Sequence, residues 1–255
     1  MEYSFNKPRN EFEKLLKRAI KGEAKAQFLV GDCYYRGDGV EKDIASALNW
    51  YRKSALQEYP EALCMLGKCY DYGYGVRFNQ REALKWYGKA VEYEYAPAQY
   101  ELGYCYLHGR GVKRNVERGI KLMEMAALQG LPDALYFLGI TYFLGEIVPQ
   151  DLKTAVLFFR KAAVKNVGNA QFLLGQCYYT GMGIVQNYKK AVIWFKKAAA
   201  REVVNAKYYL GEAYEEGLGV EADLNVAEKW YEEAAAQGCE EAKEKVKVKV
   251  KVLAY

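Results

Sequence analysis

Residues 62–90 read ALCMLGKCYDYGYGVRFNQREALKWYGKA, and this stretch decides the fold. Its pattern of small, aromatic and glycine positions returns every 36 residues without a gap. The six repeats begin at Ala26, Ala62, Ala98, Ala134, Ala170 and Ala206. A unit of this length is too short to bury its own apolar face, so this period is typical of stacked solenoid repeats.

Each repeat is predicted to be a helical hairpin. Ala62, Leu66 and Tyr70 are spaced i, i+4 and i+8, which gives one apolar stripe along a first helix. Gly73 follows where a helix end favours a left-handed residue, and Asn79 precedes the second helix as an N-cap. The equivalent positions hold Gly37, Gly109, Gly181 and Gly217, and Asp43, Asn115, Asp151, Asn187 and Asp223. The fold class is therefore all-α, an α-solenoid of stacked antiparallel helix hairpins.

A longer motif carries a family resemblance. The pattern A-x-x-x-L-G-x-x-Y-x-x-G-x-G-V, followed by Asp or Asn and then A-x-x-W-Y-x-K-A-A, occurs nearly in full over residues 26–55 and 206–235. On these motifs the chain resembles the Sel-one-like repeat (SLR) family, a relative of the tetratricopeptide repeat, over residues 26–241. The resemblance implies a right-handed superhelix whose concave surface commonly serves protein–protein adaptor roles. It implies no particular reaction.

The flanks are predicted to cap one solenoid domain that covers residues 1–255. Residues 1–25 form an N-terminal half repeat, residues 26–241 form the six repeats, and residues 242–255 form a C-terminal cap or tail. Within the tail, residues 245–252 alternate lysine and valine, which also fits a β-strand. We favour a degenerate capping helix, because terminal repeats are usually atypical. A strand would leave an edge for self-association through the tail.

The sequence carries no targeting signal that we can identify. The first residues lack a positive segment followed by an apolar run, and no apolar stretch approaches the roughly 20 residues that span a bilayer. We therefore expect a cytoplasmic protein without membrane insertion, although an upstream leader could have been removed.

The cysteines are predicted to be structural. Cys33, Cys69, Cys105 and Cys177 share one repeat position. Packed helices lie roughly 8–10 Å apart, beyond the ~7 Å Cα separation that a disulfide tolerates. We expect small buried hydrophobes there, no metal site, and the more reactive thiol at Cys239 near a loop.

Catalysis has little support in the sequence. His108 is the one histidine, and the nearest serines lie two repeats away. Cys105 and His108 are spaced i, i+3, but the position of Cys105 indicates the core. We expect no catalytic residue and no cofactor. The net charge of +5 is modest, and the lysines and arginines lie largely on the second helices of the repeats. We therefore expect no nucleic-acid partner.

Candidate binding residues are those that vary between repeats on the first helices. Their positions carry Asp32, Lys68, Asp71 or Glu212 in other repeats, which indicates exposure. The predicted partner-binding set is Tyr100, Tyr104, Leu107, His108, Tyr136, Ile140, Phe143, Leu144 and Tyr179. An apolar cluster at such positions is typical of a binding surface. The alternative is that these rings complete the packing between neighbouring first helices.

The leading hypothesis is a non-enzymatic adaptor or scaffold that binds a peptide or partner protein of unknown identity in a concave aromatic groove. The alternative comes from the resemblance, because cysteine-rich relatives are said to bind or slowly hydrolyse penicillin-like or cell-wall-derived small molecules. Neither the disulfide spacing of those relatives nor an export signal is present here.

Overall fold

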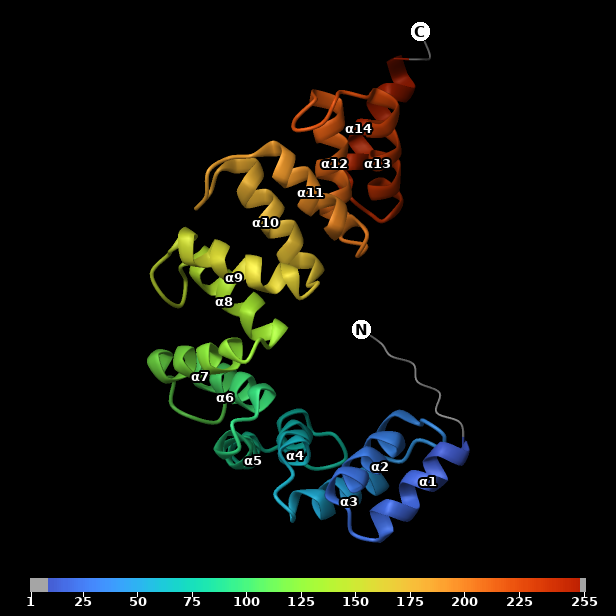
Figure 1. The fold of residues 1–255 in the computed structure, drawn as a ribbon, viewed down its shortest axis with the longest axis vertical. Coiled ribbons are helices and arrows are strands. Elements are labelled where there is room, and N and C mark those ends of the chain that lie inside the picture. Colours follow the sequence, from blue (N-terminus) through green and yellow to red (C-terminus); the bar gives the residue numbers. More distant parts are fainter. Residues whose placement is uncertain (1–8, 253–255) are drawn as a thin grey trace. The chain divides into compact units, whose positions relative to one another are not determined.

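The computed structural model describes residues 9–252, and over this range the chain is helical, with 14 α-helices and no strand (Figure 1). The first seven are α1 (Arg9–Ile20), α2 (Ala24–Arg36), α3 (Ile44–Ala55), α4 (Pro60–Tyr72), α5 (Gln80–Glu92), α6 (Ala96–His108) and α7 (Val116–Leu128). The others are α8 (Pro132–Leu144), α9 (Leu152–Val164), α10 (Gly168–Thr180), α11 (Tyr188–Ala199), α12 (Val204–Glu216), α13 (Leu224–Ala236) and α14 (Glu240–Val252). This order confirms the all-α prediction.

The chain divides into two compact units, Met1–Leu131 and Pro132–Tyr255. The first contains α1 to α7 and the second contains α8 to α14. In the first, α2 packs on α3, α4 on α5 and α6 on α7, and each hairpin also contacts the next. The second unit repeats this arrangement from α8 to α13, and α14 packs on α13. The helical hairpins are confirmed, and the single domain over residues 1–255 stays a prediction.

A close approach between Gly67 and Tyr87 explains the Leu-Gly motif. A Cβ atom on Gly67 would lie 2.5 Å from two carbon atoms of the Tyr87 ring, which is fully buried. Only a glycine at position 67 of α4 lets the Tyr87 ring of α5 pack this close to the α4 backbone. The same pairing recurs at Gly31 and Tyr51, Gly139 and Phe159, Gly175 and Phe195, and Gly211 and Tyr231.

The turns between paired helices also follow the sequence. Gly73 ends α4 with φ +73°, a left-handed conformation. Asn79 then accepts a hydrogen bond from the Glu82 amide at the start of α5. All six predicted N-cap side chains accept bonds of this kind. In the fourth repeat Ile147 replaces the second turn glycine and takes no positive φ, so that turn has a different conformation.

Two further expectations concern the C-terminal tail and the cysteines. Residues 240–252 form α14, with Ala242 buried, so the capping helix is confirmed. All six cysteines are buried and unpaired. Cys239 is the least buried of the six, at 8% exposed, but burial raises its pKa and its thiol lies beside the Glu241 carboxylate, so its greater reactivity stays a prediction.

The described residues contain neither a membrane-spanning helix nor a metal-binding cluster. No helix there is long and apolar enough to cross a membrane. No group of three or more His, Cys, Asp or Glu side chains in this part of the chain is arranged to hold a metal ion.

Candidate functional site

In the first unit, the candidate residues lie along α6. Tyr104 is half-buried and His108 is exposed, one helical turn further on. Their rings stack with centroids 4.1 Å apart, and Nδ1 of His108 lies 3.0 Å from the Tyr104 carbonyl oxygen. Tyr100, one turn before Tyr104, is half-buried. These three side chains form one stripe of the helix.

Leu107 departs from the prediction, because it is 1% exposed. A Cβ atom on Gly119 of α7 would lie 2.6 Å from the Leu107 side chain, so Leu107 fills the space that the glycine leaves. The expectation that Leu107 is exposed is therefore wrong. The sequence argument relied on Asp71 at the same repeat position, but Asp71 is also buried, at 2% exposed.

Arg110 is the partner that allows Asp71 to be buried. Its Nη2 atom lies 2.9 Å from the Asp71 carboxylate. The guanidinium carbon lies 5.7 Å from the ring centroids of both Tyr72 and Tyr104. Tyr72 is 49% exposed and stacks on Tyr74 at 5.5 Å. A cation held between two rings gives this surface a rigid centre.

Sequence reasoning missed Arg110, although a signal for it was present. Among the six repeats, the residue between the two turn glycines is a cation only here, and it follows the repeat that carries Asp71. A charge in one repeat and an opposite charge in the next would have identified the pair. Tyr72 occupies a first-helix position that is aromatic in several repeats, but it is not in the predicted binding set.

An ion pair borders the same surface. Nζ of Lys68 in α4 lies 2.9 Å from Oε1 of Glu101 in α6. Burial acts to lower the pKa of Lys68, but Glu101 more than offsets it, so the pKa is raised. Burial, with a further contribution from Glu101, raises the pKa of Tyr72. We call the exposed parts of Lys68, Tyr72, Tyr104, His108 and Arg110 the Tyr104 surface.

In the second unit, four candidates lie on α8. Leu144 is 51% exposed, while Tyr136, Ile140 and Phe143 are half-buried. The Phe143 ring lies 5.9 Å from that of Phe159 in α9, so Phe143 contributes to hairpin packing as well as to the surface. Burial raises the pKa of Tyr136.

Tyr179, on α10, is half-buried and contacts three other aromatic rings. Its ring lies 5.2 Å from that of Tyr188, 6.0 Å from Phe195 and 5.6 Å from Tyr209. Burial, followed by the carboxylate of Glu212, raises its pKa to about 12. The structure therefore places the nine candidates in two sets, one on α6 and one on α8 and α10, in different units.

Paired helices that repeat every 36 residues, with aromatic side chains on the first helix, define a helical-hairpin solenoid of the protein-interaction class. The Sel1 repeat model matches six segments, residues 24–59, 60–92, 96–131, 132–165, 168–202 and 204–239. The chain belongs to the Sel1 repeat family, whose members are generally protein-interaction scaffolds rather than enzymes.

Solved structures share the fold. A protective antigen of uropathogenic Escherichia coli with an SLR fold is 32% identical, with a TM-score of 0.84 over 92% of this chain and 50% of that one. A Sel1 repeat protein from Oxalobacter formigenes is 34% identical, with a TM-score of 0.69 over 84% of this chain and 85% of that one.

A curated relative is similar over a shorter stretch. Chitin synthase regulatory factor 3 of Schizosaccharomyces pombe is 48% identical over 58 residues, which is 22% of this chain and 6% of the yeast protein. The chain thus spans a small part of that relative and half the length of the E. coli antigen.

Proposed function

We propose that this chain is a non-enzymatic adaptor that binds a peptide or loop of a partner protein on the Tyr104 surface. The observation that carries the proposal is the Arg110 guanidinium, which is fixed by Asp71 and lies between Tyr72 and Tyr104. Fixed rings and a fixed cation lose little conformational entropy when they contact a partner.

The composition of this surface supports a protein ligand. Tyrosine and arginine are the residue types that dominate binding energy at protein interfaces. His108 and the half-exposed Tyr72 leave ring area accessible at its centre. Leu107 is left out of the proposed contact set, because it packs inside the hairpin. In the second unit, we propose that Tyr136, Ile140, Phe143, Leu144 and Tyr179 give a further contact area.

The test is an affinity pull-down from source-cell lysate with quantitative mass spectrometry. The unaltered chain is compared with a Tyr72→Ala, Tyr104→Ala variant and with Phe78→Ala as a control. Phe78 is 57% exposed and lies outside the Tyr104 surface. We expect a protein that the unaltered chain and the control retain and the double variant loses.

Thermal unfolding of each variant completes the experiment. We expect the double variant to keep a Tm close to that of the unaltered chain, because both rings are partly exposed. A large fall in Tm would assign the rings to packing and reject the proposal. Equal retention of every protein by the double variant would reject it as well.

A further inference from the structure

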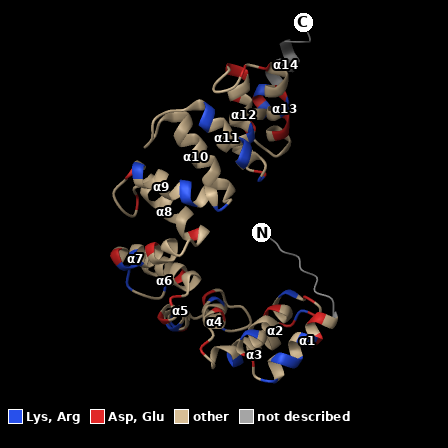
Figure 2. Cartoon of the chain, viewed as in Figure 1, with Lys and Arg blue, Asp and Glu red and all other residues tan. Residues whose placement is uncertain are grey.

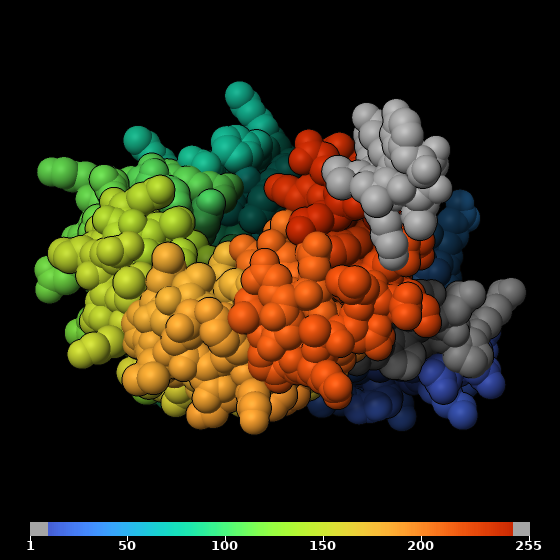
Figure 3. Space-filling view, turned by 90° about the horizontal axis from the view of Figure 1, so that it is seen from above, coloured from blue at the N-terminus to red at the C-terminus, as the bar shows by residue number. Residues whose placement is uncertain are grey.

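The helices α9 and α11 of the second unit carry positive charge and no negative charge. Three lysines and arginines lie on α9 and four lie on α11, whereas neither helix contains an aspartate or a glutamate. All of these basic side chains are exposed. Figure 2 colours their positions blue, and in Figure 3 the orange part of the second unit, which includes α11, lies at the surface. The two helices therefore present a basic surface.

Aliphatic side chains lie within this basic surface. Leu157 of α9 and Ile193 of α11 are each 54% exposed, and Val164 at the end of α9 is 65% exposed. Leu157 and Ile193 occupy the same position in the fourth and fifth repeats. In the other repeats this position holds a polar or charged residue, namely Asn49, Lys85, Lys121 or Lys229. The fold therefore does not require an aliphatic side chain here, and exposed apolar groups of this kind are typical of a binding surface.

Lysines flank both aliphatic side chains in the same way. One lies a helical turn before and one a helical turn after, which gives Lys153 and Lys161 around Leu157, and Lys189 and Lys197 around Ile193. The ammonium of Lys161 lies 5.8 Å from the Phe158 ring centroid, and that of Lys197 lies 4.3 Å from the Trp194 ring centroid. Aromatic rings thus hold these two cations beside the aliphatic groups.

The ends of α9 and α11 line one pocket, of about 390 Å³. Val164 and Asn166 belong to its α9 side, and Trp194, Lys197 and Arg201 belong to its α11 side. The volume falls in the ~300–1,000 Å³ range that is usual for ligand pockets. Because Val164 and Lys197 also belong to the basic surface, the pocket and the surface are continuous. We call the exposed side chains of α9 and α11, together with Arg201, the α9/α11 surface.

Gln171 of α10 also lines this pocket, and its side chain is incompletely hydrogen-bonded. The residue is 2% exposed, and its Nε2 atom donates to the Ala163 carbonyl oxygen at 3.0 Å. No group among the described residues donates to its Oε1 atom. A buried polar atom without a partner is uncommon and costs stability.

Other repeats supply the missing donor from their own chain. The Oε1 atom of Gln27 accepts from Gln57 at 2.8 Å, and that of Gln99 accepts from Gln129 at 3.0 Å. The equivalent donor position in the fifth repeat holds Arg201. The unsatisfied oxygen therefore favours an occupant that carries N–H groups, as every peptide does.

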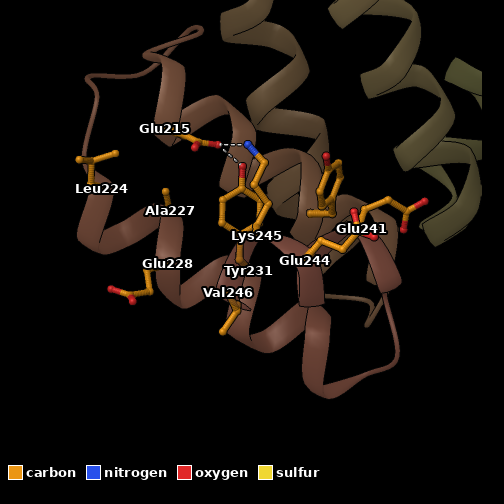
Figure 4. Close-up of a pocket in the computed structure, with 10 residues that line it drawn as sticks. Glu215, Leu224, Ala227, Glu228, Tyr231, Glu241, Glu244, Lys245 and Val246 are labelled. Atoms are coloured by element: carbon orange, nitrogen blue, oxygen red, sulfur yellow. Dashed lines mark hydrogen bonds and ion pairs between the residues drawn. The ribbon is translucent and has the colours of Figure 1, made fainter. Parts of the chain in front are cut away.

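The sixth repeat does not continue the basic surface. At the positions of Ile193, Lys196 and Lys197, α13 holds Lys229, Glu232 and Glu233. Acidic side chains on α13 and α14 are drawn in Figure 4, namely Glu228, Glu241 and Glu244. The combination of cations with exposed aliphatic groups thus ends at α11.

We propose that the α9/α11 surface binds an acidic amphipathic segment of a partner protein. Carboxylates of the segment pair with the lysines and arginines, its apolar face covers Leu157 and Ile193, and one apolar side chain enters the pocket beside Val164 and Trp194. The pocket favours a protein over a lipid bilayer, because a hollow of this size takes a projecting side chain. The aliphatic groups favour a protein over a nucleic acid, which contacts cations and stacks on exposed aromatic rings. This surface is separate from the Tyr104 surface.

The test is a fluorescence-anisotropy titration of the whole chain. The probe is a fluorescein-labelled helical peptide with leucines along one face and glutamates beside them, and the comparison peptide has lysines in place of the glutamates. We expect the acidic peptide to bind, more weakly as salt rises, and the basic peptide not to bind. Failure of the acidic peptide to bind, or equal binding of both peptides, would overturn the proposal.

A pair of charge variants locates the binding. Lys161→Gln with Lys197→Gln should weaken binding about fivefold, since two exposed charge pairs are lost. The matched control is Lys53→Gln with Lys89→Gln, which removes two cations from the same repeat position in the first unit, where each also lies over a tryptophan ring. The control should leave the affinity nearly unchanged. Equal effects of the two double variants would reject the α9/α11 surface as the site, and circular dichroism checks that each variant keeps its helices.

Leu157→Lys with Ile193→Lys separates the apolar contact from the charge. Lysine occupies this position in three other repeats, so the fold should tolerate it. The acidic peptide should bind about tenfold more weakly in spite of the added positive charge, because two aliphatic contacts are lost. Tighter binding would show that charge alone attracts the peptide and would overturn the proposal.

Two other anionic partners are compared with the peptide. Vesicles of phosphatidylcholine with phosphatidylserine, and a single-stranded oligonucleotide, are titrated against the unaltered chain and the Lys161→Gln, Lys197→Gln variant. We expect both to bind more weakly than the acidic peptide. Tighter binding of either one that the variant loses would assign the surface to a membrane or a nucleic acid and overturn the proposal. The titration uses neither Tyr72 nor Tyr104, so its failure leaves the proposed adaptor function standing.

Discussion

The guanidinium of Arg110 lies 2.9 Å from the carboxylate of Asp71, a side chain that is only 2% exposed. Asp71 belongs to α4, whereas Arg110 lies in the turn after α6, so the pair joins two successive hairpins of the first unit. The Tyr87 hydroxyl lies 3.5 Å from the second carboxylate oxygen as a weak donor. A buried carboxylate needs such partners, because an unpaired charge is costly to desolvate.

Removing the cation should therefore destabilise the protein. We expect Arg110→Met to lower the free energy of unfolding by about 2 kcal/mol, below the ~3–5 kcal/mol of a fully buried pair because Arg110 is partly exposed. Urea unfolding followed by circular dichroism measures the change. The double variant Asp71→Asn, Arg110→Met should recover part of the loss, because it removes the carboxylate charge that Arg110→Met leaves buried without its cation. A double variant as unstable as Arg110→Met would contradict this account.

The approach of Tyr87 to Gly67 gives a second stability prediction. In Gly67→Ala the new methyl group would meet two ring carbons at 2.5 Å. We expect a loss of about 2 kcal/mol, because overpacking outweighs the ~1 kcal/mol that alanine gains in a helix. Urea unfolding measures it, with Gly88→Ala in α5 as the control. Nothing lies within 4 Å of a Cβ at Gly88, so that variant should be more stable. Two variants of equal stability would reject the packing argument.

The N-caps predict a dependence on acid. Asp43 accepts hydrogen bonds from the Ser46 hydroxyl and from backbone N–H groups, and these lower its pKa, as the Thr154 hydroxyl and backbone N–H groups do for Asp151. A pKa that is lower in the folded chain contributes stability above the ordinary aspartate pKa of ~3.9, and this stability is lost as the pH falls through the folded value. The Tm should therefore drop below about pH 4.

Replacing these two aspartates by asparagine separates their contribution to the acid-dependent loss of Tm from that of other carboxylates. Asn79, Asn115 and Asn187 already cap the equivalent helices and do not titrate. An Asp43→Asn, Asp151→Asn variant should keep its helices at neutral pH and lose less Tm in acid than the unaltered chain. Identical acid profiles would show that other carboxylates control the loss.

Much of the fold was predictable, because the same pattern of small, aromatic, glycine and N-cap residues recurs in six repeats. The N-caps, the turn glycines and the length of each hairpin need only local chemistry. The alternating tail fitted two structures on local grounds, and packing of α14 on α13 selects the helix.

The exposed surface was harder to predict, because exposure depends on contacts between repeats. Asp71 looked exposed since it is charged, but Arg110 in the next repeat allows its burial. Leu107 looked exposed by analogy with Asp71, but the small Gly119 admits it to the core. Tyr104 and His108 remain accessible. Their role in binding stays a prediction.

The buried thiols give a final prediction. Burial raises the pKa of Cys64 and Cys105 to about 12 and that of Cys69 and Cys177 to about 11. At pH 8 an ordinary thiol with a pKa of ~8.5 is about one-quarter thiolate, whereas these thiols are thiolate at roughly one part in a thousand or less. The native chain should therefore react slowly with Ellman's reagent, and all six thiols should react rapidly in denaturing urea.

Cys239 provides the internal check on this prediction. Burial raises its pKa as well, and its thiol lies 3.3 Å from the Glu241 carboxylate, which further opposes formation of the thiolate. The native Cys239→Ser variant should therefore show the same slow labelling as the unaltered chain. One rapidly labelled thiol in the native chain that is lost in Cys239→Ser would show that the start of α14 opens in solution, since only opening would bring this sulfur to the reagent.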